Sequence, residues 1–163
     1  NAIIEEADAH YQNKDFSKAI EQYEQAASVN PEADYPEKRI SDIREWLAEH
    51  SLREVVNQPV ALEGNSEKKF DFQPITYRDR SNNYIVLTAS RTGSSAKIFL
   101  NYGAGDQRHG GVVISNVPEG KARQFVFNLT DRRSWRENEN NWISVYTQGG
   151  GISIKGLDIS KGD

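Results

Sequence analysis

The sequence predicts an α+β protein in two parts, with α-helices over residues 1–50 and an antiparallel β-sandwich over residues 65–163. Before Ser51, apolar residues recur at three- and four-residue steps, which is the period of an amphipathic helix. After Ser51 they alternate with polar residues, which is the period of a strand. The length of 163 residues suits one or two domains.

Two helices are expected at the start of the chain, separated by residues 13–15. Asp15 can cap the second helix, because its side chain can accept a hydrogen bond from a free backbone N–H. Pro31 ends this helix, since proline cannot continue the helical hydrogen-bond pattern. The two apolar stripes consist of Ile3, Ile4, Ala7 and Tyr11, and then of Ala19, Ile20, Tyr23, Ala26 and Ala27.

Over residues 2–34 this hairpin resembles a tetratricopeptide repeat in the order and spacing of its small, aromatic and proline residues. The tryptophan and leucine that are usual in the first helix are replaced by Ile3 and Glu6. The resemblance implies two antiparallel helices that mediate protein-protein contact. The matching positions are Ala7, Tyr11, Phe16, Ala19, Tyr23, Ala26 and Pro31.

A third helix is expected after Tyr35, because Pro36 favours a helix start and Glu37 places an acid in the first turn. This helix resembles the capping helix that closes a repeat array. Its apolar stripe consists of Ile40, Ile43 and Leu47.

A single repeat cannot bury its own apolar face, since about three are needed for a stable stack. We therefore expect Ile3, Ile4 and Tyr11 of the first helix to contact a protein partner, an upstream repeat or the sandwich. The chain begins at Asn1 and contains no methionine, so we interpret it as part of a longer protein with further repeats upstream.

Residues 51–64 are expected to form a linker or a first edge strand, because Pro59 and Gly64 interrupt a short apolar stretch. Short alternating runs then follow without a helical pattern between them, which is typical of an antiparallel sandwich or barrel. These runs cover residues 70–77, 84–91, 97–102, 111–117, 122–129, 142–148 and 152–159.

The parity of each run assigns its two faces, because successive side chains of a strand point to opposite sides. The inward residues include Ile85, Leu87 and Ala89 on one strand and Ile98, Leu100 and Tyr102 on another. The run from residue 142 places Trp142, Ser144, Tyr146 and Gln148 together on the outward face.

From about residue 55 onward, the order of these features is similar to the galactose-binding-like jelly roll of carbohydrate-binding modules. This resemblance implies a jelly-roll sandwich that binds sugar without catalysis. It also implies a structural calcium ion near the last strand, for which Asp158 and Glu63 are candidates, the alternative being two surface acids. The resemblance lies in residues 84–90, 96–100, 118–121, 125–127 and 149–159.

Sugar binding needs an aromatic face for the C–H side of the sugar ring and polar groups for its hydroxyls. Trp142 and Tyr146 are the candidate stacking residues, and Asn101, Arg108 and His109 are the candidate hydrogen-bonding residues. The alternative is that Trp142 covers one end of the sandwich core.

Two loops allow further interpretation. Trp135 lies among charged residues in the loop 131–141, so it either marks a contact surface or folds back to anchor the loop. Residues 103–111 are rich in glycine, but they open no helix and no Gly-Lys-Ser/Thr follows, so we interpret them as a flexible hairpin and not as a phosphate site.

Composition excludes several functions. The net charge of −4 and the pI near 5.5 argue against nucleic-acid binding, which needs an excess of clustered Lys and Arg. No cysteine is present, so disulfides, zinc-thiolate sites and thiol catalysis are excluded. No catalytic motif is recognisable, and no apolar run is long enough to span a membrane. We expect no catalytic residue and no cofactor.

Two interpretations remain. In the first, the sandwich is a non-catalytic module that binds a polysaccharide or surface glycan, while the helices hold a protein partner. In the second, the chain is a structural or assembly protein of the cell envelope, and both parts dock protein partners. Either interpretation places the chain outside the cytoplasm of a bacterium, in the periplasm or at the cell surface.

Overall fold

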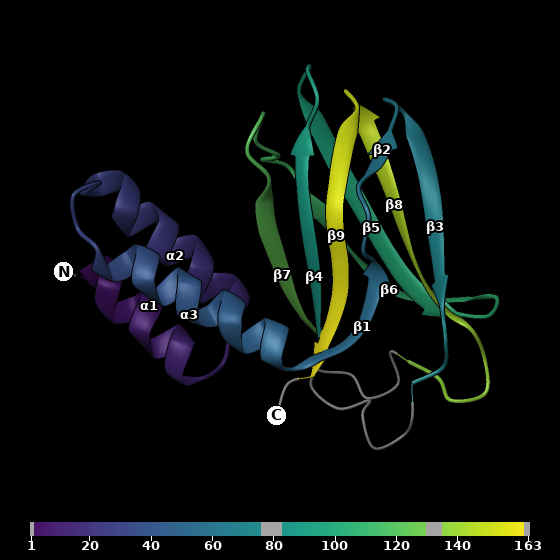
Figure 1. Ribbon diagram of the computed structural model, residues 1–163, viewed down its shortest axis with the longest axis horizontal. Helices are drawn as coiled ribbons and strands as arrows, with labels where there is room; N and C mark the ends of the chain where they lie inside the picture. The colour runs from purple at the N-terminus through teal and green to yellow at the C-terminus, as the bar shows by residue number, and fades with distance from the viewer. Residues whose placement is uncertain (1, 76–82, 130–134, 162–163) are drawn as a thin grey trace.

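The computed structural model describes residues 2–75, 83–129 and 135–161. In this part of the chain, three helices precede an antiparallel β-sandwich (Figure 1), which confirms the predicted fold class. The helices are α1 (Ala2–Gln12), α2 (Phe16–Val29) and α3 (Tyr35–Glu49). The strands are β1 (Ser51–Val56), β2 (Val60–Leu62), β3 (Ser66–Phe72), β4 (Asn83–Arg91), β5 (Ala96–Ala104), β6 (Gln107–Ile114), β7 (Arg123–Leu129), β8 (Asn141–Gly149) and β9 (Ile152–Lys161).

The strands form two sheets. The first sheet has the order β1-β9-β4-β7, with β2 also paired to β9, and the second has the order β3-β8-β5-β6. All of these pairings are antiparallel. Of the two alternatives for residues 51–64, the structure contains edge strands, because β1 and β2 pair with successive parts of β9.

The main core lies between the two sheets. The residues that parity placed inward, such as Ile85, Leu87, Ile98 and Leu100, are buried there. Trp135 is 0% exposed and packs against Phe72 and Tyr102, with ring centroids 5.1 and 5.7 Å away. It therefore anchors its loop, and the alternative of an exposed contact residue is wrong. Residues 130–134 of that loop lie outside the described part of the chain.

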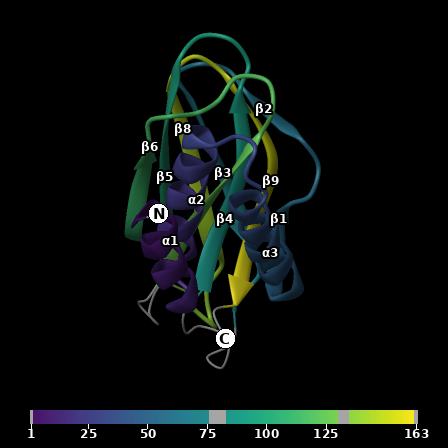
Figure 2. The same ribbon diagram turned by 90° about the vertical axis from the view of Figure 1, so that its left-hand side faces the viewer.

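The helices pack on the outer face of the first sheet (Figure 2). The ring of Phe16 stacks on Tyr84 at 5.4 Å between centroids, and the Tyr84 hydroxyl donates to the carbonyl of Lys14 at 2.5 Å. At the other side of the contact, the Ser160 hydroxyl donates to the carbonyl of Leu47 at 2.8 Å. Strand β4 is consequently buried on both faces, which explains why residues 84–87 form a continuous apolar run.

The three helices extend away from the sandwich (Figure 1). Ala7, Ala19 and Tyr23 are fully buried between them, so the small residues allow a close approach of α1 to α2. Ile4 and Tyr11, two of the residues expected to meet a partner, are partly buried against this helical core. Within the described ranges, no helix is long and apolar enough to cross a membrane.

The segment 103–111 forms a hairpin, as expected. Ala104 pairs with Gln107, so β5 and β6 continue almost to the tip of the hairpin. A two-residue turn at Gly105 and Asp106 joins them, and Gly105 has a φ of 54°, which favours glycine. The predicted hairpin is therefore confirmed, and most of the segment is paired strand.

Candidate functional site

The outer face of the second sheet, called the open face here, carries aromatic and polar side chains in rows. In the pairing of β5 with β8, Phe99 lies opposite Tyr146, Asn101 opposite Ser144, and Gly103 opposite Trp142. Directly opposed residues point to the same side of a sheet, so each pair forms a row across the strands. Strand β3 extends the three rows with Glu67, Lys69 and Asp71.

The two outer rows are aromatic. Tyr146 and Phe99 lie side by side, with ring centroids 6.0 Å apart, and both are partly exposed. Trp142 is also partly exposed and lies four residues from Tyr146 along β8, a separation of roughly 13 Å. Lys69 places its ammonium group 5.0 Å from the centre of the Trp142 ring, a cation–π arrangement.

The indole of Trp142 is held in place by its surroundings. Its Nε1–H donates to the carbonyl of Gly105 at 3.0 Å. Gly103 leaves room for the ring, because a Cβ atom at that position would lie only 2.7 Å from Cζ2 of Trp142. The ring therefore lies on the outside of the sheet, and the alternative that it covers the end of the core is wrong.

The middle row, called the polar row, consists of Lys69, Ser144, Asn101 and Arg108. Ser144 is 6% exposed and forms part of the floor between the aromatic rows. Arg108 donates from Nε to Oδ1 of Asn101 at 2.7 Å. Its guanidinium lies over Gly111, since a Cβ atom there would be 2.9 Å from Nη2 of Arg108.

Four of the five expected ligand-binding residues, Trp142, Tyr146, Asn101 and Arg108, thus share the open face. The fifth, His109, is half-buried in an irregularity of the β5–β6 pairing, where Tyr102 faces Gly110 and Gly103 faces Arg108. The expectation missed Phe99, Lys69 and Lys97. Parity could have assigned Lys69 to an outward face, because Phe70 and Phe72 of the same strand point inward, but not to a position beside Trp142.

The expected calcium ligands lie apart. Leu62, which precedes Glu63, is opposite Ile152, whereas Asp158 is opposite Glu54. Six residues of β9 separate these two positions, or roughly 20 Å, so the two carboxylates cannot share an ion. In the described ranges, no group of three or more His, Asp and Glu side chains is placed to hold a metal ion.

Asp158 has an unusual environment on the outer face of the first sheet. Its Oδ1 atom is buried and has no hydrogen-bond partner. Burial, reinforced by the nearby charge of Glu54, raises the pKa of this carboxyl to about 6. It lines a small cavity under α3 together with Arg44 and Gln124, so the group belongs to the contact between the helices and the sandwich.

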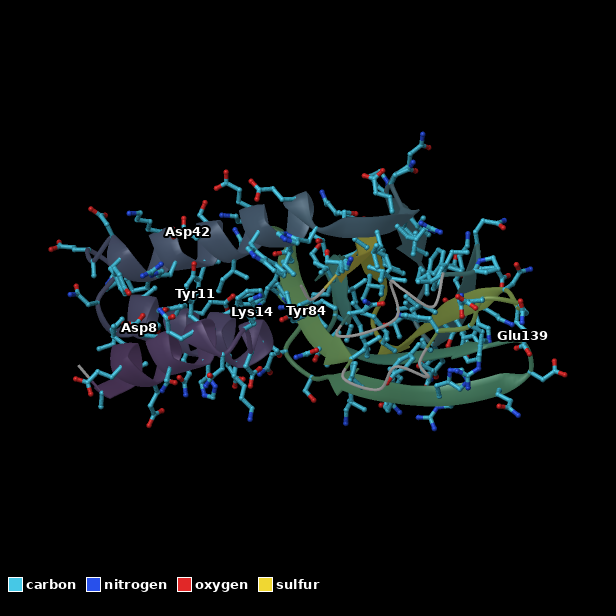
Figure 3. All side chains as sticks on the ribbon, turned by 90° about the horizontal axis from the view of Figure 1, so that it is seen from below. Asp8, Tyr11, Lys14, Asp42, Tyr84 and Glu139 are labelled. Atoms are coloured by element: carbon cyan, nitrogen blue, oxygen red, sulfur yellow. The ribbon has the colours of Figure 1, made fainter. Side chains whose placement is uncertain are left out.

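A second polar cluster connects the three helices. Figure 3 shows Asp8, Tyr11 and Lys14 between α1 and α3. Asp8 accepts hydrogen bonds from the hydroxyls of Tyr23 and Tyr35, at 2.5 and 2.7 Å. Burial and this carboxylate raise the pKa of Tyr23. The guanidinium of Arg39 lies 4.6 Å from the Tyr11 ring centre, so Tyr11 is already engaged within its own chain.

No family model matches this chain, and neither does any curated protein. Xylanase 10C from Cellvibrio japonicus, in complex with xylopentaose, is a similar solved structure, with 14% identity over 63% of this chain and 22% of that chain and a TM-score of 0.49. This chain thus spans about a fifth of the xylanase chain.

Two smaller proteins are also similar. The C-terminal family 22 carbohydrate binding module of Clostridium thermocellum Xyn10B has 11% identity over 71% of this chain and 95% of that chain, with a TM-score of 0.44. The C-terminal domain of EclA, a sugar-binding protein, has 12% identity over 67% and 81% of the two chains, with a TM-score of 0.42.

Proposed function

We propose that this chain is a non-catalytic module that binds a polysaccharide on the open face. The observation that carries the proposal is the arrangement of three partly exposed rings on both sides of the polar row. Ring faces can pack on the C–H side of sugar rings, while the amide of Asn101 can exchange hydrogen bonds with sugar hydroxyls.

The Trp142 ring is prepared for such stacking. Its hydrogen bond to Gly105 and its contact with Gly103 fix its orientation before a ligand arrives, which lowers the entropic cost of binding. The face is open and not enclosed, so we expect modest affinity. Dissociation constants of roughly micromolar to millimolar correspond to about 4–8 kcal/mol.

The carboxylates of the open face support binding without cleavage. Glycoside hydrolysis needs one carboxyl group on each side of the scissile bond. Glu67 and Asp71 both lie on β3, at one edge of the face, so they would stand on the same side of a bound chain. The proposed role is therefore to hold a polysaccharide and not to hydrolyse it.

Calorimetry with a panel of plant, algal and bacterial polysaccharides tests this function. We expect Trp142→Ala and Tyr146→Ala each to weaken binding at least tenfold. Tyr35→Ala removes a comparable ring from the far helices and should leave affinity within twofold, with circular dichroism as the check on folding. Binding that survives both substitutions on the open face would contradict the proposal.

A second candidate function concerns the far end of the helices, where the tetratricopeptide-like hairpin would hold a protein partner. Val29 is 66% exposed and Tyr35 is 39% exposed at this end. A shallow groove beside them is lined by Ile4, Ala26 and Pro36. If no polysaccharide binds and a partner is captured through residues 1–50, the assembly role in the cell envelope replaces the first proposal. Both roles suit an extracytoplasmic location.

A further inference from the structure

Building on the function proposed above, we infer that the polysaccharide held by the open face is acidic, and that its carboxylates pair with Lys69 and Arg108. The inference comes from where the cations stand relative to the rings and to the polar row. Acidic polysaccharides are thereby named as the ligand class of the open face. Polysaccharide binding can be upheld even if the ligand proves to be neutral.

The polar row begins and ends with a cation. Lys69 stands on β3 at one edge of the sheet, and the guanidinium of Arg108 lies over Gly111 of β6 at the other edge. Three strand spacings separate these edges, or roughly 14 Å. A chain lying along the row would therefore meet a positive charge at both ends.

Arg108 is oriented for a carboxylate. Its Nε–H is used by Asn101, which fixes the plane of the guanidinium across the row. Arg108 is exposed, so its Nη groups can donate to a ligand, and a planar guanidinium can bind a carboxylate through two parallel hydrogen bonds. Within the part of the chain that the structure describes, neither Arg108 nor Lys69 forms an ion pair.

Two of the three rings already carry a cation. Lys69 lies over Trp142 at 5.0 Å, and Lys97 lies over Phe99 at 5.7 Å. A neutral sugar stacking on Trp142 would gain the ring contact but would displace the ammonium group without offering it a new charged partner. An acidic sugar would let the ammonium group move from the ring to the carboxylate, so the lost cation–π contact is replaced by a charge-assisted hydrogen bond.

The acids of the face limit the charge density of the ligand. Glu67 and Asp71 stand on either side of Lys69, and the carboxylate of Glu139 lies beside Gly105 at the Trp142 end, so the three cations (Lys69, Lys97 and Arg108) are balanced by three carboxylates. The whole chain carries −4. A densely sulfated chain would meet these carboxylates, whereas a carboxylate on a stacked sugar would meet Lys69 or Arg108. The face therefore favours uronic acids over a general polyanion.

The test is calorimetry of the full chain with polygalacturonate, alginate and hyaluronate, each compared with its carboxyl-reduced, neutral form. We expect at least one acidic polymer to bind at least tenfold more tightly than its reduced form, with the difference shrinking in 0.5 M salt. Arg108→Gln and Lys69→Gln should each weaken that binding at least fivefold. Lys155→Gln makes the same charge change on β9, away from the open face, and should leave the affinity for the acidic polymer within twofold.

The outcomes separate the two proposals. If reduced polymers bind as tightly as acidic ones and Trp142→Ala still abolishes binding, the acidic ligand is wrong and the binding module stands. If only neutral polysaccharides of the wider panel bind, the acidic ligand is likewise wrong and the binding module stands. Dextran sulfate binding as tightly as the uronates, regardless of Trp142→Ala, would overturn the inference in favour of general polyelectrolyte attraction. If no polysaccharide binds at all, both proposals fail.

Discussion

The indole of Trp142 lies directly over Gly103 of the neighbouring strand. A Cβ atom on Gly103 would come within 2.7 Å of Cζ2 of the indole, and it would also overlap the carbonyl oxygen of Gln107. The absence of a side chain at residue 103 is therefore a requirement both of the candidate site and of the β5–β6 hairpin that supports it.

We predict that Gly103→Ala lowers the free energy of unfolding by about 1–3 kcal/mol, the usual cost of inserting atoms where no space exists. The same substitution should tilt Trp142 and weaken ligand binding beyond the loss of stability. Urea unfolding and calorimetry measure the two effects. Gly93→Ala is the control, because a Cβ atom at Gly93 meets nothing within 4 Å. Equal stability of the two variants would contradict the prediction.

Phe16 is expected to be the main anchor between the helices and the sandwich. It is buried between Trp46 and Tyr84, with ring centroids at 5.1 and 5.4 Å. Phe16→Ala should cost about 3–5 kcal/mol of stability, as for other buried aromatic rings. Tyr84→Phe keeps the ring, removes the hydroxyl that donates to the carbonyl of Lys14, and should cost about 1 kcal/mol. A loss below about 1 kcal/mol for Phe16→Ala in thermal or urea unfolding would show that the helices dock without it.

Asp158 should make stability depend on pH. Burial and the charge of Glu54 raise its pKa from 3.8 to about 6 in the folded protein, so the folded state binds more protons than the unfolded state between these values. Stability from this group is therefore present below about pH 4 and is lost as the pH rises through 6. Asp158→Asn should remove this dependence and stabilise the protein at pH 7 by about 1 kcal/mol, a value discounted for the part of the side chain that remains in solvent.

Unfolding free energies of the wild type and of Asp158→Asn between pH 4 and 7.5 check this prediction. The two curves should meet near pH 4, separate between pH 4 and 6, and stay apart by a constant amount above pH 6. Parallel curves across the whole range would mean that the carboxyl group is better solvated than its position under α3 indicates.

The faces of the strands were predictable, because parity depends only on neighbours in the sequence. That is why the alternation of residues alone places Trp142, Tyr146 and Asn101 on outward faces. The partners of each strand were not predictable, since pairing joins residues distant in sequence. Lys69 was missed because nothing local places β3 beside β8, and Glu63 was wrongly joined to Asp158 because nothing local places β2 along the first part of β9.

Irregularities of the sheet were equally invisible in the sequence. The change of register at Tyr102 and Gly103 brings Arg108 onto the open face and sets His109 apart. A bulge interrupts the two-residue period of a strand, and no sequence pattern marks its position.

The docking of the helices on the first sheet, by contrast, left a signal in the sequence. Tyr84, Val86 and Val126 are apolar on the outward parity of their strands, which indicates that something covers the first sheet.

The polar contacts that join the helices to the first sheet, among them the ion pair of Arg123 with Glu24, have a mechanical consequence. The hydrogen bonds of Tyr84 with Lys14 and of Ser160 with Leu47 attach the three helices at two separate points. The helices therefore resist rotation about either point. The open face looks away from these helices. A partner bound by the helices and a polymer bound on the open face would thus be held at a fixed distance and on opposite sides of the protein. The connection between them would be rigid, unlike a flexible linker.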